Sequence, residues 1–246
     1  GRLVMLAGEP GIGKTRTAQE LGVSAEQRGA QILWGRCHEE EGAPPYWPWV
    51  QSMRTYVQQT APEQLVEEMG LGAAAIGEII PEIRSKLPAA ETPPDLEPQA
   101  ARFRLFDSIT TFLKNVAQRQ PLMVVLDDLH WADRSTLLLL EFVAREIGTS
   151  KISLVGAYRD IEVSRRHPLS QTLGALIREQ LFQRVQLNGL TQQEVGELVE
   201  GSAGITLSHE AAEVIHKRTD GNPFFVGEVT RQVARDNITE DQGWAS

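Results

Sequence analysis

The 246-residue sequence predicts an α/β fold with three layers, in which a parallel five-stranded sheet lies between two layers of helices. Two observations carry this prediction. Strand-like runs alternate with helical segments over the first 190 residues, the order expected when parallel strands are joined by crossing helices. From residue 191 onward the pattern becomes entirely helical, which predicts a small helical subdomain after the sheet.

The strands are expected at residues 3–7, 31–35, 122–126, 152–158 and 184–188. The runs at 3–7 and 122–126 are continuously apolar, which is typical of parallel strands buried on both faces. The connecting helices are expected at residues 14–28, 101–117, 134–147 and 169–180. Within the 101–117 helix one face is predicted to contact the core, and it carries Phe103, Phe106, Ile109, Leu113 and Val116.

A helical insertion is expected over residues 36–100, between the second strand and the 101–117 helix. Its Pro-rich segment, residues 88–98, cannot hold a helix and is expected to be a mobile connection. The aromatic cluster of Tyr46, Trp47 and Trp49 could stack a nucleotide base. Packing of this cluster onto the sheet is the favoured interpretation.

The helical subdomain carries its own local signals. Thr191 and Glu194 have the spacing of a capping box, which predicts the start of a helix. A second helix is expected to begin near Ser208. Residues 219–225 are expected to end that helix and open another.

Residues 8–15 fit G-x-x-x-x-G-K-[ST], the loop that cradles phosphates in nucleoside triphosphatases. The loop follows an apolar strand and opens a helix, the context that this chemistry needs. Its glycines let the backbone N–H groups approach phosphate oxygens closely, and the helix N-terminus adds positive potential. Lys14 is expected to pair with the β- and γ-phosphates, and the Thr15 hydroxyl to ligate Mg²⁺. The predicted nucleotide-binding residues of this segment are Gly8, Glu9, Pro10, Gly11, Ile12, Gly13, Lys14, Thr15 and Arg16.

Asp127 and Asp128 directly follow the third expected strand. A carboxylate at the C-terminal tip of a parallel strand beside the phosphate loop can serve as a Mg²⁺ ligand, and we assign that role to Asp127. Asp128 is placed to orient or deprotonate an attacking water. The alternative is that both residues only begin a solvated loop after a core strand.

Arg159 stands at the tip of the fourth expected strand. A guanidinium there could sense the γ-phosphate and neutralise charge during phosphoryl transfer, so we name Lys14, Asp128 and Arg159 as catalytic candidates. The alternative is an ordinary surface arginine that pairs with Asp160. The histidines have no consistent ligand spacing, so no metal site beyond Mg²⁺ is proposed.

Composition narrows the function further. The net charge of −9 argues against direct nucleic-acid binding or binding to anionic membranes by this segment. The single cysteine, Cys37, rules out an internal disulfide and fits a reducing compartment, so a cytoplasmic location is expected. No apolar run approaches a membrane span, so no membrane partner is expected. Gly1 stands two positions before the first strand, which suggests a domain cut from a longer protein.

The sequence resembles the bacterial STAND-type P-loop ATPases, AAA-like modules found before LuxR-type DNA-binding regions or beside nucleotide cyclase domains. The stretches that carry the resemblance are residues 7–16, 42–49, 126–133, 156–159 and 220–225. The resemblance implies a P-loop NTPase fold that binds ATP or ADP with Mg²⁺. It also implies that Pro223 contacts the base side of the nucleotide and that Arg159 is the sensor arginine.

The domains expected on this basis are a P-loop nucleotide-binding domain at residues 1–190 and a partial, lid-like helical domain at 191–246. The resemblance implies a slowly hydrolysing switch that closes with ADP and self-associates with ATP. The effector and sensor domains of such a regulator are expected to lie outside this segment. Two alternatives stay open: an ATPase that remodels or loads protein or DNA, and a catalytically silent scaffold.

Overall fold

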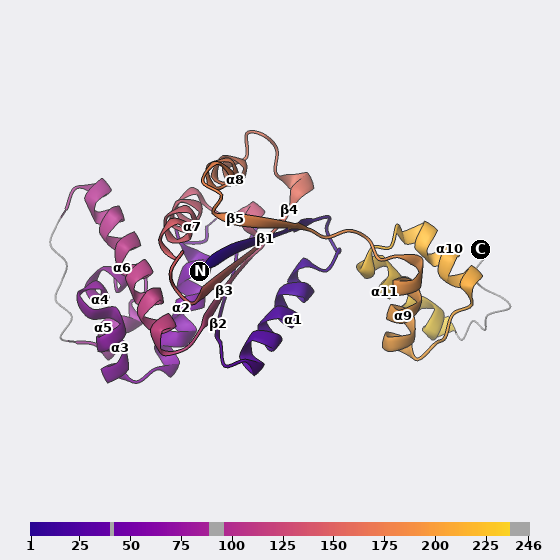
Figure 1. The fold of residues 1–246 in the computed structure, drawn as a ribbon, viewed down its shortest axis with the longest axis horizontal. Helices are drawn as coiled ribbons and strands as arrows, with labels where there is room; N and C mark the ends of the chain where they lie inside the picture. Colours follow the sequence, from indigo (N-terminus) through magenta and orange to yellow (C-terminus); the bar gives the residue numbers. More distant parts are fainter. Residues whose placement is uncertain (40–41, 89–95, 237–246) are drawn as a thin grey trace. The chain divides into compact units, whose positions relative to one another are not determined.

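The computed structural model describes residues 1–39, 42–88 and 96–236 (Figure 1). Residues 89–95, in the expected mobile connection, and residues 237–246 lie outside the described residues. The described chain forms two compact units. The first comprises residues 1–6 and 15–185, and the second comprises residues 7–14 and the chain from 186 onward.

A five-stranded sheet is the centre of the fold, with the strand order β2-β3-β4-β1-β5. Its strands are β1 (Arg2–Gly8), β2 (Gln31–Arg36), β3 (Leu122–Asp127), β4 (Ile152–Arg159) and β5 (Phe182–Gln186). β3 pairs in parallel with both β2 and β4, and all of its residues are buried. The predicted α/β class with a five-stranded parallel sheet is therefore confirmed. The last strand begins at Phe182, two residues before the predicted start.

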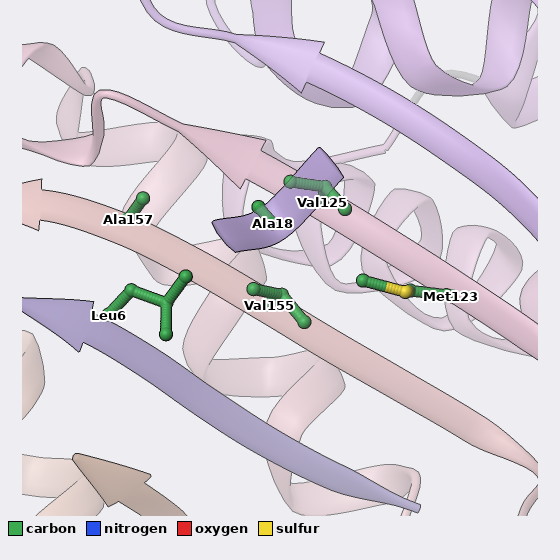
Figure 2. Close-up of a cluster of buried hydrophobic side chains, with 6 residues drawn as sticks. All are labelled: Leu6, Ala18, Met123, Val125, Val155 and Ala157. Carbon is green, nitrogen blue, oxygen red and sulfur yellow. The ribbon is translucent and has the colours of Figure 1, made fainter. Parts of the chain in front are cut away.

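Helix α1 (Lys14–Gln27) lies on one face of the sheet, and α2, α7 and α8 lie on the other (Figure 1). At its contact with the sheet, α1 presents Ala18 to a layer of aliphatic strand residues (Figure 2). That layer is contributed by β1, β3 and β4 and comprises Leu6, Met123, Val125, Val155 and Ala157. An alanine at this contact lets the helix backbone approach the strands closely.

The opposite face of the sheet carries the predicted helical insertion and the later connecting helices. Its elements are α2 (Trp47–Gln59), α3 (Pro62–Met69), η1 (Gly70–Gly72), α4 (Ala73–Ile76), α5 (Glu82–Lys86), α6 (Pro98–Arg119), α7 (Arg134–Glu146) and α8 (Pro168–Arg178). α2 approaches β2 so closely that a Cβ at Gly35 would lie 1.8 Å from the Pro48 carbonyl oxygen. Only glycine fits at this contact.

The aromatic cluster of the insertion packs against the fold, as favoured from the sequence. Trp49 is fully buried, and its Nε1 donates to the Thr136 carbonyl oxygen at 3.2 Å. Tyr46 packs edge-on against Phe106 at 5.9 Å between ring centroids. The prediction of a core position is wrong for one residue of α6. Phe103, near the start of this helix, is 62% exposed, because this part of the helix faces solvent.

In the described part of the second unit the helices are α9 (Gln192–Ala203), α10 (His209–Thr219) and α11 (Pro223–Asp236). The predicted capping box is present, with Thr191 and Glu194 each accepting from the other's backbone N–H. Ser208 caps α10 as expected. Val195, Val199, Ile215 and Val226 form the core between the helices. None of the helices in the described residues is long and apolar enough to cross a membrane.

Candidate nucleotide-binding site

The two sequence motifs meet at one hydrogen bond in the first unit. Thr15, in the first turn of α1, donates from Oγ1 to Oδ2 of Asp127 at 2.8 Å, although 112 residues separate them in the chain. The other carboxylate oxygen of Asp127 accepts from the Asp128 backbone N–H at 3.0 Å. Burial raises the pKa of Asp127, and the Thr15 hydrogen bond partly offsets this effect. A hydroxyl and a carboxylate together form an oxygen donor set of the kind that Mg²⁺ prefers.

The phosphate loop itself belongs to the second unit. Gly8, Gly11 and Gly13 all have positive φ angles, of 154°, 79° and 101°. Such angles are strained for any residue with a Cβ, which explains why the loop needs glycine at these positions. Lys14 is buried, and its Nζ donates to the carbonyl oxygens of Gly8 and Glu9 at 2.9 and 2.7 Å.

The remaining loop residues differ in exposure. Glu9 and Pro10 are exposed, whereas Ile12 is buried. Arg16 points to solvent and forms an i,i+4 ion pair with Glu20 at 2.6 Å. Such an exposed pair contributes little to stability. The binding role predicted for Arg16 therefore has less geometric support than the role of Lys14.

Asn222 ties the phosphate loop to α11 within the second unit. Its Nδ2 donates to the Pro10 carbonyl oxygen at 2.9 Å, and its Oδ1 accepts from the Phe224 backbone N–H at 3.1 Å. A Cβ at Gly11 would lie 2.7 Å from the Cβ of Phe224. Pro223 is the first residue of α11 and is thus placed beside this link. Asn222 lies in the stretch 220–225 that carries the resemblance, but no role was predicted for it, although an Asn before a Pro is a helix-capping signal.

Asp128 is held by an arginine that the sequence analysis did not single out. Nε and one terminal nitrogen of Arg36 each lie 2.7 Å from Oδ2 of Asp128. The hydrogen bond to Asp128 raises the pKa of Arg36. Asp128 is buried and has a left-handed backbone, with φ of 56°. Arg36 ends β2 opposite Asp127 at the end of β3, so the strand register brings the arginine beside these carboxylates.

The side chain of Arg159 contacts Glu162 and Trp131. It donates to Glu162 at 2.7 Å, and its guanidinium lies 5.0 Å from the centroid of the Trp131 ring. The alternative partner suggested by the sequence, Asp160, instead lies 3.6 Å from Arg184. The structure therefore gives Arg159 an ion pair, but with a different acid.

His130 lies between Asp128 and Arg159, two of the three predicted catalytic residues. Its Nδ1 accepts from the Arg159 backbone N–H at 3.4 Å, and its Nε2 lies 3.9 Å from Oδ1 of Asp128. The same Nε2 is 3.6 Å from Glu162. The buried His130 and the exposed Glu162 thus lie between Asp128 and Arg159. Neither residue was assigned a role from the sequence, because their proximity depends on how β3 and β4 end side by side.

A family profile described as "AAA ATPase domain" matches residues 1–156. The chain belongs to this family. The chain is 24% identical over 172 residues to an uncharacterized protein of Rhizobium meliloti (strain 1021). The aligned region covers 65% of this chain and 16% of that protein.

A solved structure with a similar fold is a STAND protein (Signal Transduction ATPase with Numerous Domains) with a tetratricopeptide repeat sensor, from Pyrococcus horikoshii. The TM-score is 0.52 at 13% identity, and the match covers 97% of this chain and 30% of that one. The Thermotoga maritima RuvB Holliday junction branch migration motor aligns with a TM-score of 0.46 at 20% identity, over 96% of this chain and 54% of that one. This AAA ATPase domain thus spans well under half of the curated relative and of the STAND protein.

Proposed function

We propose that this AAA ATPase domain binds ATP and ADP with Mg²⁺ and hydrolyses ATP slowly, as the switch module of a larger signal-transduction protein. In this proposal residues 1–190 form the nucleotide-binding domain and 191–246 a lid-like helical domain. The nucleotide state controls domain closure and self-association. The observation that carries the proposal is the hydrogen bond between Thr15 and Asp127, which joins the phosphate-loop motif to the acidic strand end.

The residues present fit the nucleotide and the metal. Thr15 and Asp127 would hold the metal ion, and Lys14 and the loop N–H groups would bind the phosphates. When bound, Mg²⁺ neutralises charge that develops on the phosphate oxygens during transfer. Asp128 would accept a proton from the attacking water, and Arg159 would respond to the γ-phosphate.

The ion pair between Arg36 and Asp128 supports slow hydrolysis. A carboxylate can accept a proton from water only with a free lone pair that is aimed at that water. Oδ2 of Asp128 receives two guanidinium contacts at 2.7 Å, so at least this oxygen is engaged. Hydrolysis would then require either that the ion pair opens or that Oδ1 of Asp128 accepts the proton from water. Slow turnover suits a switch, whose signal lasts as long as the bound triphosphate.

The link through Asn222 supports coupling between nucleotide and conformation. Asn222 joins the Pro10 carbonyl of the loop to the first turn of α11. A loop that adjusts to bound phosphates would therefore transmit that adjustment to α11. The contact that we propose for Pro223 on the base side would report on the same ligand from the neighbouring position.

The test is a calorimetric titration of the full chain with Mg-ATP and Mg-ADP, with Lys14→Ala as the variant. We expect binding by the wild type and none by a folded Lys14→Ala, because the lysine supplies the charge that faces the phosphates. Arg102→Glu, on an exposed position of α6, is a matched control that should bind like the wild type. Unchanged affinity in folded Lys14→Ala would refute the assignment of the phosphate loop.

The same samples separate the alternatives. A tighter Kd for ADP than for ATP, with turnover well below the roughly 1–10³ s⁻¹ of typical enzymes, supports the switch. Turnover that rises when a protein or DNA polymer is added supports a remodelling or loading ATPase. Binding without any turnover supports the silent scaffold. The link to a transcriptional or cyclase output is proposed only from the resemblance and would be tested in the longer parent protein.

A further inference from the structure

Five side chains at the C-terminal edge of the sheet form one series of contacts, in the order Arg36, Asp128, His130, Glu162 and Arg159. All of them belong to the first unit. The two carboxylates are held in the same way. Arg36 contacts Oδ2 of Asp128 at 2.7 Å, and Arg159 contacts Oε1 of Glu162 at 2.7 Å. The other oxygen of each carboxylate lies near the ring of the histidine between them.

The backbone determines which nitrogen of His130 carries the proton. Nδ1 accepts from the Arg159 backbone N–H at 3.4 Å, so in the neutral ring the proton lies on Nε2. The His130 side chain is fully buried, and its ring packs against that of Trp131 at 4.5 Å between centroids. The ring therefore presents one N–H group, in a direction set by the ends of β3 and β4, to the two carboxylates.

This one N–H lies between two acceptors. Nε2 of His130 is 3.6 Å from Oε2 of Glu162 and 3.9 Å from Oδ1 of Asp128. Both distances exceed the roughly 2.7–3.2 Å of a full N–H···O bond, so a shift of about half to one ångström completes the bond to either acceptor. A single N–H can complete a well-aligned bond to only one of them at a time. His130 thus shares its donor between the two acids in this structure.

The arginines decide which acid receives the N–H. Each arginine neutralises the carboxylate that it contacts. A carboxylate that loses its arginine keeps its full negative charge and competes more strongly for a hydrogen-bond donor. Arg159 is the residue of this series that we propose to respond to the γ-phosphate. Its departure from Glu162 would therefore draw the N–H of His130 away from Asp128.

We propose that His130 is a positioning residue whose Nε2–H passes from Asp128 to Glu162 when a triphosphate is bound. With Arg159 on Glu162, the shared N–H near Oδ1 and the guanidinium on Oδ2 compete with water for the lone pairs of Asp128. Once Arg159 turns to the γ-phosphate, the freed Glu162 takes the N–H and Oδ1 becomes available to water. Asp128 therefore becomes a base only after Arg159 has reached the γ-phosphate. This inference rests on the proposed function and adds the regulation of its site.

The first test uses no nucleotide and observes the His130 ring by ¹⁵N NMR of the full chain at about pH 8, where an ordinary histidine is neutral. The chain has five histidines, and the signals of His130 are those lost in His130→Gln. Two variants give reference positions for Nε2: Glu162→Gln for the bond to Asp128, and Asp128→Asn for the bond to Glu162. We expect the wild-type signal between these references, and Arg159→Gln should move it to the Asp128→Asn position. A wild-type ring protonated on Nδ1, or a signal that Arg159→Gln does not move, would overturn the proposal.

The same signal is then followed in the wild type with nucleotide. A non-hydrolysable ATP analogue with Mg²⁺ should shift it in the direction of Arg159→Gln, because both remove the arginine from Glu162. Mg-ADP lacks the γ-phosphate and should leave the signal in place. An analogue that binds tightly without moving the His130 signal contradicts the exchange of the N–H.

The second test is turnover at saturating Mg-ATP, measured together with the Kd for nucleotide. Glu162→Gln removes the competing carboxylate, so we expect kcat to fall about tenfold with the Kd unchanged. If Glu162 only restrained Arg159, the same substitution would leave kcat unchanged or raise it, and either result would refute the proposal. Glu26→Gln, on an exposed position of α1, is the matched control and should behave like the wild type.

A double-mutant cycle shows whether the effect of Glu162 passes through His130. His130→Phe keeps an aromatic ring beside Trp131 and removes the N–H. In that background Glu162→Gln should no longer lower kcat, and an equal tenfold loss there would show that Glu162 acts by another route. Thermal melting establishes that each variant is folded. The Arg159→Gln comparison does not use His130→Phe and decides the proposal even if that variant fails to fold.

The two proposals can fail separately. If the wild type neither binds nor hydrolyses Mg-ATP, the proposed function fails, and the Arg159→Gln comparison still decides whether the N–H changes partner. If binding and hydrolysis follow the expected pattern but the His130 signal stays in place, the exchange fails and the proposed function stands.

Discussion

Replacing Arg36 should accelerate hydrolysis. The guanidinium contacts Oδ2 of Asp128 through two nitrogens at 2.7 Å, while its own side chain is 54% exposed. A hydrogen bond to a charged group is worth about 1.5–3 kcal/mol, and an exposed ion pair at most about 1 kcal/mol. For this half-exposed pair we take about 1–2 kcal/mol. If the pair must open before Asp128 acts, Arg36→Ala should raise kcat by about 5- to 30-fold.

The assay is steady-state phosphate release at saturating Mg-ATP, with ADP affinity measured in parallel. Arg36→Lys keeps the charge with a single donor nitrogen and should give a smaller increase. Asp128→Asn should keep nucleotide binding and lose hydrolysis, and adding Arg36→Ala to it should restore nothing. A thermal melt is needed, because Asp128 is buried and loses its partner. A folded Arg36→Ala with normal ADP affinity and an equal or lower kcat would refute the argument and make Arg36 a residue that positions Asp128 for catalysis.

Two further predictions follow from buried polar groups. Burial raises the pKa of Cys37 to about 12, so at pH 8 only about one thiol in 10⁴ is a thiolate. Iodoacetamide should therefore label Cys37 only when the protein is unfolded in denaturant. Rapid labelling of the native protein would contradict the burial of this thiol. Asn222→Asp should keep the acceptor for the Phe224 N–H but remove the donor to the Pro10 carbonyl. We expect a loss of about 1–3 kcal/mol in urea unfolding, and unchanged stability would show that this bond does not hold the loop.

The sequence predicts the sheet because its signals are local. A short apolar run such as residues 122–126 favours a buried strand, and the run is buried throughout. Phe103 shows where this reasoning fails: helical periodicity predicts a stripe, but not how far along the helix the core extends. The acidic end of β3 was predicted for the same local reason, since Asp127 and Asp128 directly follow the apolar run.

The partners of those acids could not be predicted in the same way. Arg36 acts on Asp128 because β2 lies next to β3, and strand order is a property of the whole chain. His130 and Glu162 come together because β3 and β4 end at the same edge. Arg36, His130 and Glu162 are polar residues at or just after the end of a strand, and many surface residues occupy such positions. Only the register of the paired strands determines which of these polar residues come into contact.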